Sequence, residues 1–186
     1  MAGRKEALTL LIALLILPAS AWQAPAQEIK SLSLGTFHSP KGLGFCIVSQ
    51  QEDKSFDSFD IISDTFGILR GDYSTPGIKA TYYRGIILKH SHREDCDADF
   101  YAGPGVTAGY VRDIHEPFSA VAGMSGVIGG RLYFDRKRLA ICMEAGLDLA
   151  LELNRNNRYR NIDLSIYKAG IYHVFYPQVR ILYRLK

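Results

Sequence analysis

The chain has 186 residues and a formal net charge of +3, so a single domain is the default expectation and the charge is too small to imply a nucleic-acid partner. A hydrophobic content of 47% and a charged content of 22% lie within the globular range and argue against disorder. The 17 Gly, 11 Tyr and 9 Phe favour a β protein with tightly curved strands.

The N-terminus carries the pattern of a secretory signal peptide. Two basic residues near the start are followed by an apolar run over residues 7–17 and then by small residues. This run is shorter than the roughly 20 residues that a transmembrane helix needs. Both Ala19-Ser20-Ala21 and Ala24-Pro25-Ala26 fit the A-x-A cleavage pattern. We predict a cut after Ala26, which removes residues 1–26 and leaves 27–186 as one domain.

The next part of the chain alternates apolar and polar residues in segments separated by turns. Alternation predicts strands, because successive side chains of a strand point to opposite faces. In the segment that begins at Ile78, Lys79 and Lys89 are predicted on the polar face, while Arg84 interrupts the apolar face. Turn residues are expected near 38–42, 50–54, 70–77 and 90–97. The predicted strands cover 29–37, 43–48, 56–69 and 78–88.

The second half contains longer alternating segments. A strand is predicted over 100–110, a long hairpin over 117–153 with its turn at 135–138, a loop over 154–161, and a last strand over 175–185. In the second arm of the hairpin, every odd residue from Leu139 to Leu153 is apolar. This arm is about three times the usual strand length of 5–6 residues.

Counting these segments predicts an all-β, closed, antiparallel up-and-down barrel. The count is eight if residues 163–172 belong to a long final loop and nine if they form a strand, and we expect eight because bacterial single-chain barrels have even counts. The turns at 50–54, 90–97 and 135–138 then share one end. The loops at 38–42, 70–77, 112–117 and 154–172 share the other.

Three features favour a barrel that faces lipid over a soluble one. Strands of 10 to 16 residues match a tilted membrane span, which needs about 9–11. The polar faces mix isolated charges with Gly, Ser, Thr and Ala, which suits a narrow lumen. Aromatic residues such as Phe37, Phe100 and Tyr183 lie near strand ends, as in the interfacial girdles of membrane barrels.

In these features the chain resembles the small outer-membrane β-barrels of Gram-negative bacteria, of the OmpX or OmpA-transmembrane-domain kind. The signal peptide, the strands YAGPGVTAGY and LAICMEAGLDLALEL, and the closing strand YPQVRILYRLK carry the resemblance. The resemblance implies an outer-membrane location, contact with outer-membrane lipid and lipopolysaccharide, insertion by the barrel-assembly machinery, and a monomer.

An eight-stranded barrel has an interior just wide enough to be filled by side chains. Charged residues on the polar faces should pair there, because an unpaired buried charge costs several kcal/mol. The expected consequence is a plugged barrel without an aqueous pore, a metal or a cofactor. The predicted lumen network contains Asp60, Asp64, Lys79, Arg131, Glu144, Asp148, Arg180 and Arg184.

Motifs for chemistry are weak. The ligand-type residues of 90–97 fit a solvated turn, and the glycines of 103–109 do not keep the G-x-G-x-x-G spacing. Some outer-membrane barrels act on lipid A with Ser and His, and the candidates for such a set are His38, His115, His173 and Ser125. No spacing fixes them into a triad. We expect a non-enzymatic structural, adhesion or recognition protein; the alternatives are a lipid A-modifying enzyme and a soluble ligand-binding barrel.

Cysteine usage gives a further expectation. The three cysteines, Cys46, Cys96 and Cys142, leave at least one thiol unpaired in an oxidising compartment. Cys46 and Cys142 are both predicted to face inward, on strands that are not neighbours, and a disulfide needs Cα atoms within about 7 Å. No structural disulfide is therefore expected.

Overall fold

A computed structural model describes residues 30–40, 42–52, 54–65, 69, 77–92, 97–111, 119–134, 138–156, 161–166 and 175–185. The predicted signal peptide and its cleavage site lie outside these residues. Within the described part of the chain there are nine strands: β1 (Ser31–Ser39), β2 (Gly42–Glu52), β3 (Ser55–Ser63), β4 (Ile78–His92), β5 (Asp97–Val111), β6 (Ser119–Phe134), β7 (Leu139–Asn156), β8 (Asn161–Ile166) and β9 (Tyr176–Arg184).

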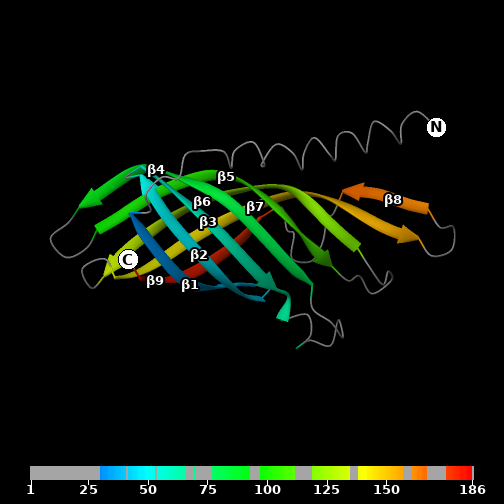
Figure 1. The fold of residues 1–186 in the computed structure, drawn as a ribbon, viewed down its shortest axis with the longest axis horizontal. Coiled ribbons are helices and arrows are strands. Elements are labelled where there is room, and N and C mark those ends of the chain that lie inside the picture. Colours follow the sequence, from blue (N-terminus) through cyan, green and yellow to red (C-terminus); the bar gives the residue numbers. More distant parts are fainter. Residues whose placement is uncertain are drawn as a thin grey trace.

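Eight of these strands close into an antiparallel barrel (Figure 1). Strands β1 to β7 pair in sequence order, and β9 then pairs with both β7 and β1. Closure gives every barrel strand a neighbour on both sides, so the sheet has no free edge. The predicted all-β, eight-stranded, up-and-down barrel is confirmed.

Strand β8 lies outside this circle. It pairs with the last residues of β7, from Leu151 to Asn156, whereas β9 pairs with the first part of β7, from Leu139 to Gly146. Figure 1 shows β8 beside the far end of β7. The prediction that 154–161 is a loop is therefore wrong at its start, because β7 continues to Asn156, and part of the predicted final loop is a strand.

A β-bulge in β4 changes the prediction for Lys89. Ile87 pairs with Tyr101 and Lys89 pairs with the next residue back, Phe100, so one residue of β4 has no partner. An extra residue reverses the alternation of faces beyond it. Lys89 is exposed on the outer face together with Phe100, and its assignment to the polar inner face is wrong.

The connections define two ends of the barrel. The end carrying the connections at 53–54, 93–96 and 135–138 also holds the start of β1 and the finish of β9, and we name it the turn end. We name the opposite end, with the longer connections at 64–77, 112–118 and 157–175, the loop end.

Apolar side chains cover the outside of the barrel and charged ones occupy the inside. On β7 the residues from Ala140 to Glu152 at even positions are buried, while odd positions such as Met143 and Leu149 are 66% and 63% exposed. Phe45 on β2 is 72% exposed. The outward apolar residues include Leu43, Ile47, Phe59, Ile61, Ile86, Val106, Met124, Ile128, Leu147, Val179, Ile181 and Tyr183.

Aromatic rings packed over glycines fill much of the inner wall. Phe56 lies opposite Gly85 across the β3–β4 pair, and a Cβ added to Gly85 would collide with the Phe56 ring. The same relation joins Phe37 to Gly44. Each glycine thus leaves room for the ring of its cross-strand neighbour, which allows large side chains inside a narrow barrel.

Candidate functional site

Arg180 on β9 is the centre of the polar interior. Its side chain is fully buried, and its Nη1 and Nη2 donate to Oδ1 and Oδ2 of Asp60 at 2.9 and 2.6 Å. Nη2 also donates to Glu144 Oε2 at 2.9 Å, and Nη1 donates to Ser58 Oγ at 3.0 Å. The guanidinium therefore meets two carboxylates, one of them through the paired geometry that Arg prefers. Three strands that are distant in sequence are joined through this one side chain.

Glu144 on β7 is held by neutral donors as well as by Arg180. Tyr83 donates to its Oε1 at 3.1 Å, Tyr101 donates to the same oxygen, and the amide of Gln178 donates to Oε2. A buried charge is tolerated when it is paired and its remaining lone pairs accept hydrogen bonds. The Glu144 carboxylate meets both conditions.

Lys79 and Asp148 form a second buried pair nearer the loop end. Lys79 Nζ donates to Asp148 Oδ2 at 2.6 Å and lies 4.3 Å from the centre of the Tyr176 ring. Ser125 donates to the other oxygen of Asp148 at 2.8 Å. Lys79 and Asp148 are 3% and 3% exposed, so this pair is shielded from water.

The predicted lumen residues thus fall into several groups. Five of them form the two clusters just described: Asp60, Glu144 and Arg180 in one, Lys79 and Asp148 in the other. Asp64 is buried beyond β3, at the loop end, and Arg184 is partly buried at the turn end. These two residues therefore lie at opposite ends of the barrel. Arg131 is buried in a third place, among aromatic rings.

The lumen is filled at the level of Arg180. Arg180, Tyr101 and Cys142 are 0% exposed and Phe56 is 1% exposed. A side chain can be fully buried inside a barrel only when neighbours pack against it on every side. This arrangement suits a plug that joins strands and is unsuited to the passage of a solute.

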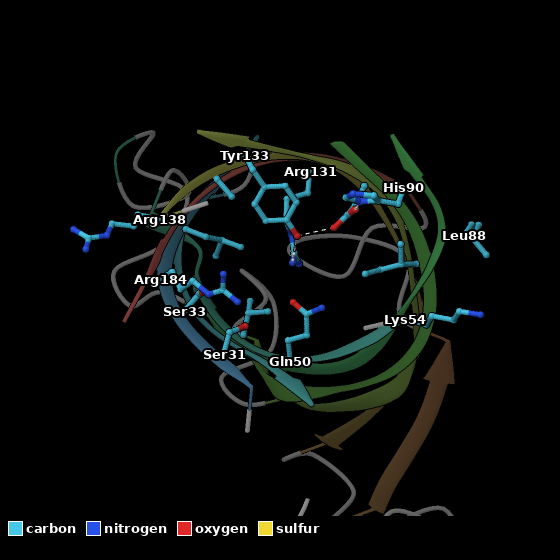
Figure 2. Close-up of a pocket in the computed structure, with 15 residues that line it drawn as sticks. Ser31, Ser33, Gln50, Lys54, Leu88, His90, Arg131, Tyr133, Arg138 and Arg184 are labelled. Atoms are coloured by element: carbon cyan, nitrogen blue, oxygen red, sulfur yellow. Dashed lines mark hydrogen bonds and ion pairs between the residues drawn. The ribbon is translucent and has the colours of Figure 1, made fainter. Parts of the chain in front are cut away.

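A cavity of about 610 Å³ lies between this plug and the turn end. Figure 2 shows Arg131, Tyr133, Arg184 and Gln50 directed into it, while the Arg138 and Lys54 side chains point away from the lumen. We name it the turn-end cavity. Its lining residues are Ser31, Ser33, Val48, Gln50, Lys54, Ile87, Leu88, His90, Asp99, Arg131, Tyr133, Arg138, Ala140, Leu182 and Arg184.

Arg131 at the base of this cavity is held mainly by aromatic rings. Its guanidinium carbon lies 4.2 Å from the centre of the Phe56 ring and 5.4 Å from that of Tyr101, distances at which cation–π attraction operates. Its Nη1 donates to the Tyr133 hydroxyl at 3.4 Å. No ion pair joins it to a carboxylate among the described residues, although Asp99 is its cross-strand partner.

Asp99 is engaged by two other groups. Tyr133 donates to its Oδ2 at 2.6 Å, and Nδ1 of His90 lies 2.5 Å from its Oδ1. Sequence reasoning left Asp99, Tyr133 and His90 out of the network. The sequence predicts a turn at His90, but β4 continues to His92 and carries His90 to the lumen side. The alternation of β5 and β6 could have found Asp99 and Tyr133, because they share a face with Tyr101 and Arg131.

The two candidate catalytic residues that the structure describes lie on opposite faces of the barrel wall. His38 is exposed on the outer face of β1, whereas Ser125 faces the lumen and donates to Asp148. His115 and His173 lie outside the described residues. Within the described part of the chain, no group of three His, Cys, Asp or Glu side chains is arranged to hold a metal ion. Cys46 and Cys142 are buried free thiols, and Cys96 lies outside the described residues.

Comparisons with known proteins show no family for this chain. No protein-family model matches the chain, and no curated protein is similar to it at a significant level. Among solved structures, the chain resembles a major outer membrane protein from Thermus thermophilus, with 9% identity, 83% of this chain and 98% of that chain covered, and a TM-score of 0.46. A likeness at this identity and TM-score shows neither a family nor a function. None of the described residues belongs to a helix long and apolar enough to span a membrane.

Proposed function

We propose that this protein is an integral outer-membrane β-barrel of a Gram-negative bacterium, with a lumen plugged by side chains and a non-enzymatic structural or recognition role. The observation that carries the proposal is the distribution of side chains, which is the reverse of that in a water-soluble protein: charged residues lie inside and apolar residues lie outside. Arg180, Glu144 and Asp148 are buried in the interior, while large apolar side chains on every barrel strand face outward.

Water is a poor solvent for such a surface. Soluble monomers rarely expose contiguous apolar patches larger than a few hundred Å², and a soluble barrel would place its apolar residues inside. In lipid the same surface is favourable, and full closure of the sheet satisfies the backbone groups that the bilayer cannot solvate. The predicted signal peptide supports export to the envelope.

Fractionation of cells that express the full chain tests the location. We expect the protein in the outer-membrane fraction, resistant to carbonate extraction, with a gel mobility that changes on heating because the barrel resists the detergent at room temperature. Recovery as a soluble periplasmic protein would overturn the proposal.

A charge placed on the outer face tests the same proposal by energetics. Ile47 is in the middle of β2 and 47% exposed. In a bilayer, Ile47→Arg should lower the free energy of unfolding by about 2–4 kcal/mol. On a water-exposed surface the same change should stay within about 0.5 kcal/mol, so a small effect would favour a soluble barrel.

The non-enzymatic part of the proposal needs its own measurement. Mass spectrometry of lipid A from a host with and without the protein should give identical profiles. If the protein altered the lipid A profile and the Ser125→Ala or His38→Ala variant did not, the result would support the lipid-modifying alternative. Ser125 and His38 are the candidate catalytic residues that the structure describes.

A further inference from the structure

The turn-end cavity is lined by charged side chains that take no part in the Arg180 cluster. Among its described lining residues there are four Lys or Arg side chains, Lys54, Arg131, Arg138 and Arg184, and one carboxylate, Asp99. Two of the four cations, Arg131 and Arg184, point into the cavity in Figure 2. Among the described lining residues, cationic side chains therefore outnumber carboxylates.

Arg131 is the buried cation of this lining, and no carboxylate pairs with it among the described residues. It is 5% exposed, its Nε has no hydrogen-bond partner among the described residues, and its hydrogen bond to the Tyr133 hydroxyl is long at 3.4 Å. The Cys142 thiol is a further neighbour of the guanidinium. The Phe56 ring attracts one face of the guanidinium but accepts no hydrogen bond in its plane. A planar guanidinium that borders a cavity and has no carboxylate partner among the described residues can direct its Nη groups at an oxyanion.

Asp99 does not fill this role. Both of its carboxylate oxygens are engaged, one by the Tyr133 hydroxyl at 2.6 Å and the other by His90 at 2.5 Å. Arg180 pairs directly with the carboxylates of Asp60 and Glu144. The carboxylate nearest to Arg131 in the strand pairing, Asp99, instead binds Tyr133 and His90.

We propose that the turn-end cavity binds a small organic oxyanion, with its phosphate or carboxylate group held by Arg131 and its apolar part against the cavity wall. The apolar part of the wall consists of Val48, Ile87, Ala140 and Leu182. A volume of about 610 Å³ is within the range of about 300–1,000 Å³ for small-molecule sites and exceeds what a free inorganic anion fills. Gln50, Ser31 and Ser33 supply further polar groups.

The ligand is a soluble molecule. The cavity lies inside the barrel wall near the turn end, so a lipid on the outer surface is separated from Arg131 by the sheet (Figure 2). The inference goes beyond the proposed function and does not rest on it, because the same lumen exists whether the outer face meets lipid or water.

Calorimetric titration of the refolded full-length barrel in uncharged maltoside micelles tests the proposal, with phenyl phosphate and benzoate as probes. We expect saturable binding of at least one probe, no binding of neutral phenol, and weaker binding of inorganic phosphate. Arg131→Met should weaken binding about tenfold or more, since a hydrogen bond to a charged group is lost.

Arg138→Met is the matched control, because Arg138 lines the same mouth but points away from the lumen. We expect it to leave affinity within twofold. A heat-dependent gel shift for each variant ensures that the barrel is folded. In ¹⁵N spectra the Nε–Hε signal that disappears in Arg131→Met should shift on titration. Absence of binding to both anionic probes by the folded protein, or equal affinity in Arg131→Met, would overturn the proposal.

Discussion

Two buried arginines in one lumen are treated in opposite ways. Arg180 donates to Asp60, Glu144 and Ser58 at 2.6 to 3.0 Å. Arg131 stacks on Phe56 and has no carboxylate ion pair among the described residues. Both cations belong to neighbouring layers of the same barrel, yet one is neutralised by the protein and the other is left to aromatic faces.

The difference teaches how a barrel this narrow can combine a plug with a binding site. The Arg180 layer joins β3, β7 and β9, and its guanidinium is paired with two carboxylates. Arg131 borders a cavity and has no carboxylate partner among the described residues. The arginine that joins strands and the arginine that is proposed to bind a ligand therefore lie at different heights along the barrel axis.

The largest expected effect breaks the Arg180 layer. Arg180→Met would leave Asp60 and Glu144 as buried carboxylates without their cation, which should lower the free energy of unfolding by about 3–5 kcal/mol. Urea unfolding followed by far-ultraviolet circular dichroism measures it, because the single Trp of the chain, Trp22, lies in the predicted signal peptide.

Neutral partners provide the control for this change. Adding Asp60→Asn and Glu144→Gln to Arg180→Met removes the unpaired charges and should recover part of the stability. If Arg180→Met cost no more than Arg131→Met, the contrast between the two layers would be wrong.

The next effect disturbs the ring that supports Arg131. Gly85→Ala adds a Cβ that collides with Phe56, and overpacking of this kind costs about 1–3 kcal/mol. It should also weaken anion binding by moving the surface on which Arg131 stacks. Gly130→Ala is the matched control, since the nearest atom to its added Cβ is 3.8 Å away; equal stability loss in both variants would contradict the packing argument.

Removing Arg131 should be much milder for folding than removing Arg180. Arg131→Met leaves no carboxylate that had been paired with it, and the attraction to Phe56 contributes about 1 kcal/mol. We expect the free energy of unfolding to fall by roughly that amount in the urea experiment, while anion affinity falls far more in relative terms. A loss of several kcal/mol would indicate that Arg131 belongs to the structural network.

The smallest effect is expected at the rim. Arg138 is exposed, and Arg138→Met should change the free energy of unfolding by less than about 0.5 kcal/mol. Thermal unfolding of the two variants side by side is sufficient to detect the contrast with Arg131. A binding loss equal to that of Arg131→Met would place the anion outside the cavity.

The sequence by itself determined the architecture and the facing of most side chains. Strict alternation from Leu139 to Leu153 decides which residues share a face, because a strand has a period of two. Closure is expected because an open sheet edge in lipid would leave backbone groups without hydrogen-bond partners. Asp60, Glu144 and Arg180 could be assigned to one face in this way before any contact was known.

Only the tertiary structure decided which charges meet. Alternation fixes the face of a residue but not its height along the barrel or its neighbour across the lumen, so it could not distinguish the partnered Arg180 from Arg131. The bulge at Ile87 and Lys89 moved Lys89 to the outer face, and strand extension brought His90 to Asp99. The bulge and the longer strand both depend on how β4 pairs with β5. That pairing is set by backbone hydrogen bonds between the strands, and the pattern of side chains in the sequence does not predict it.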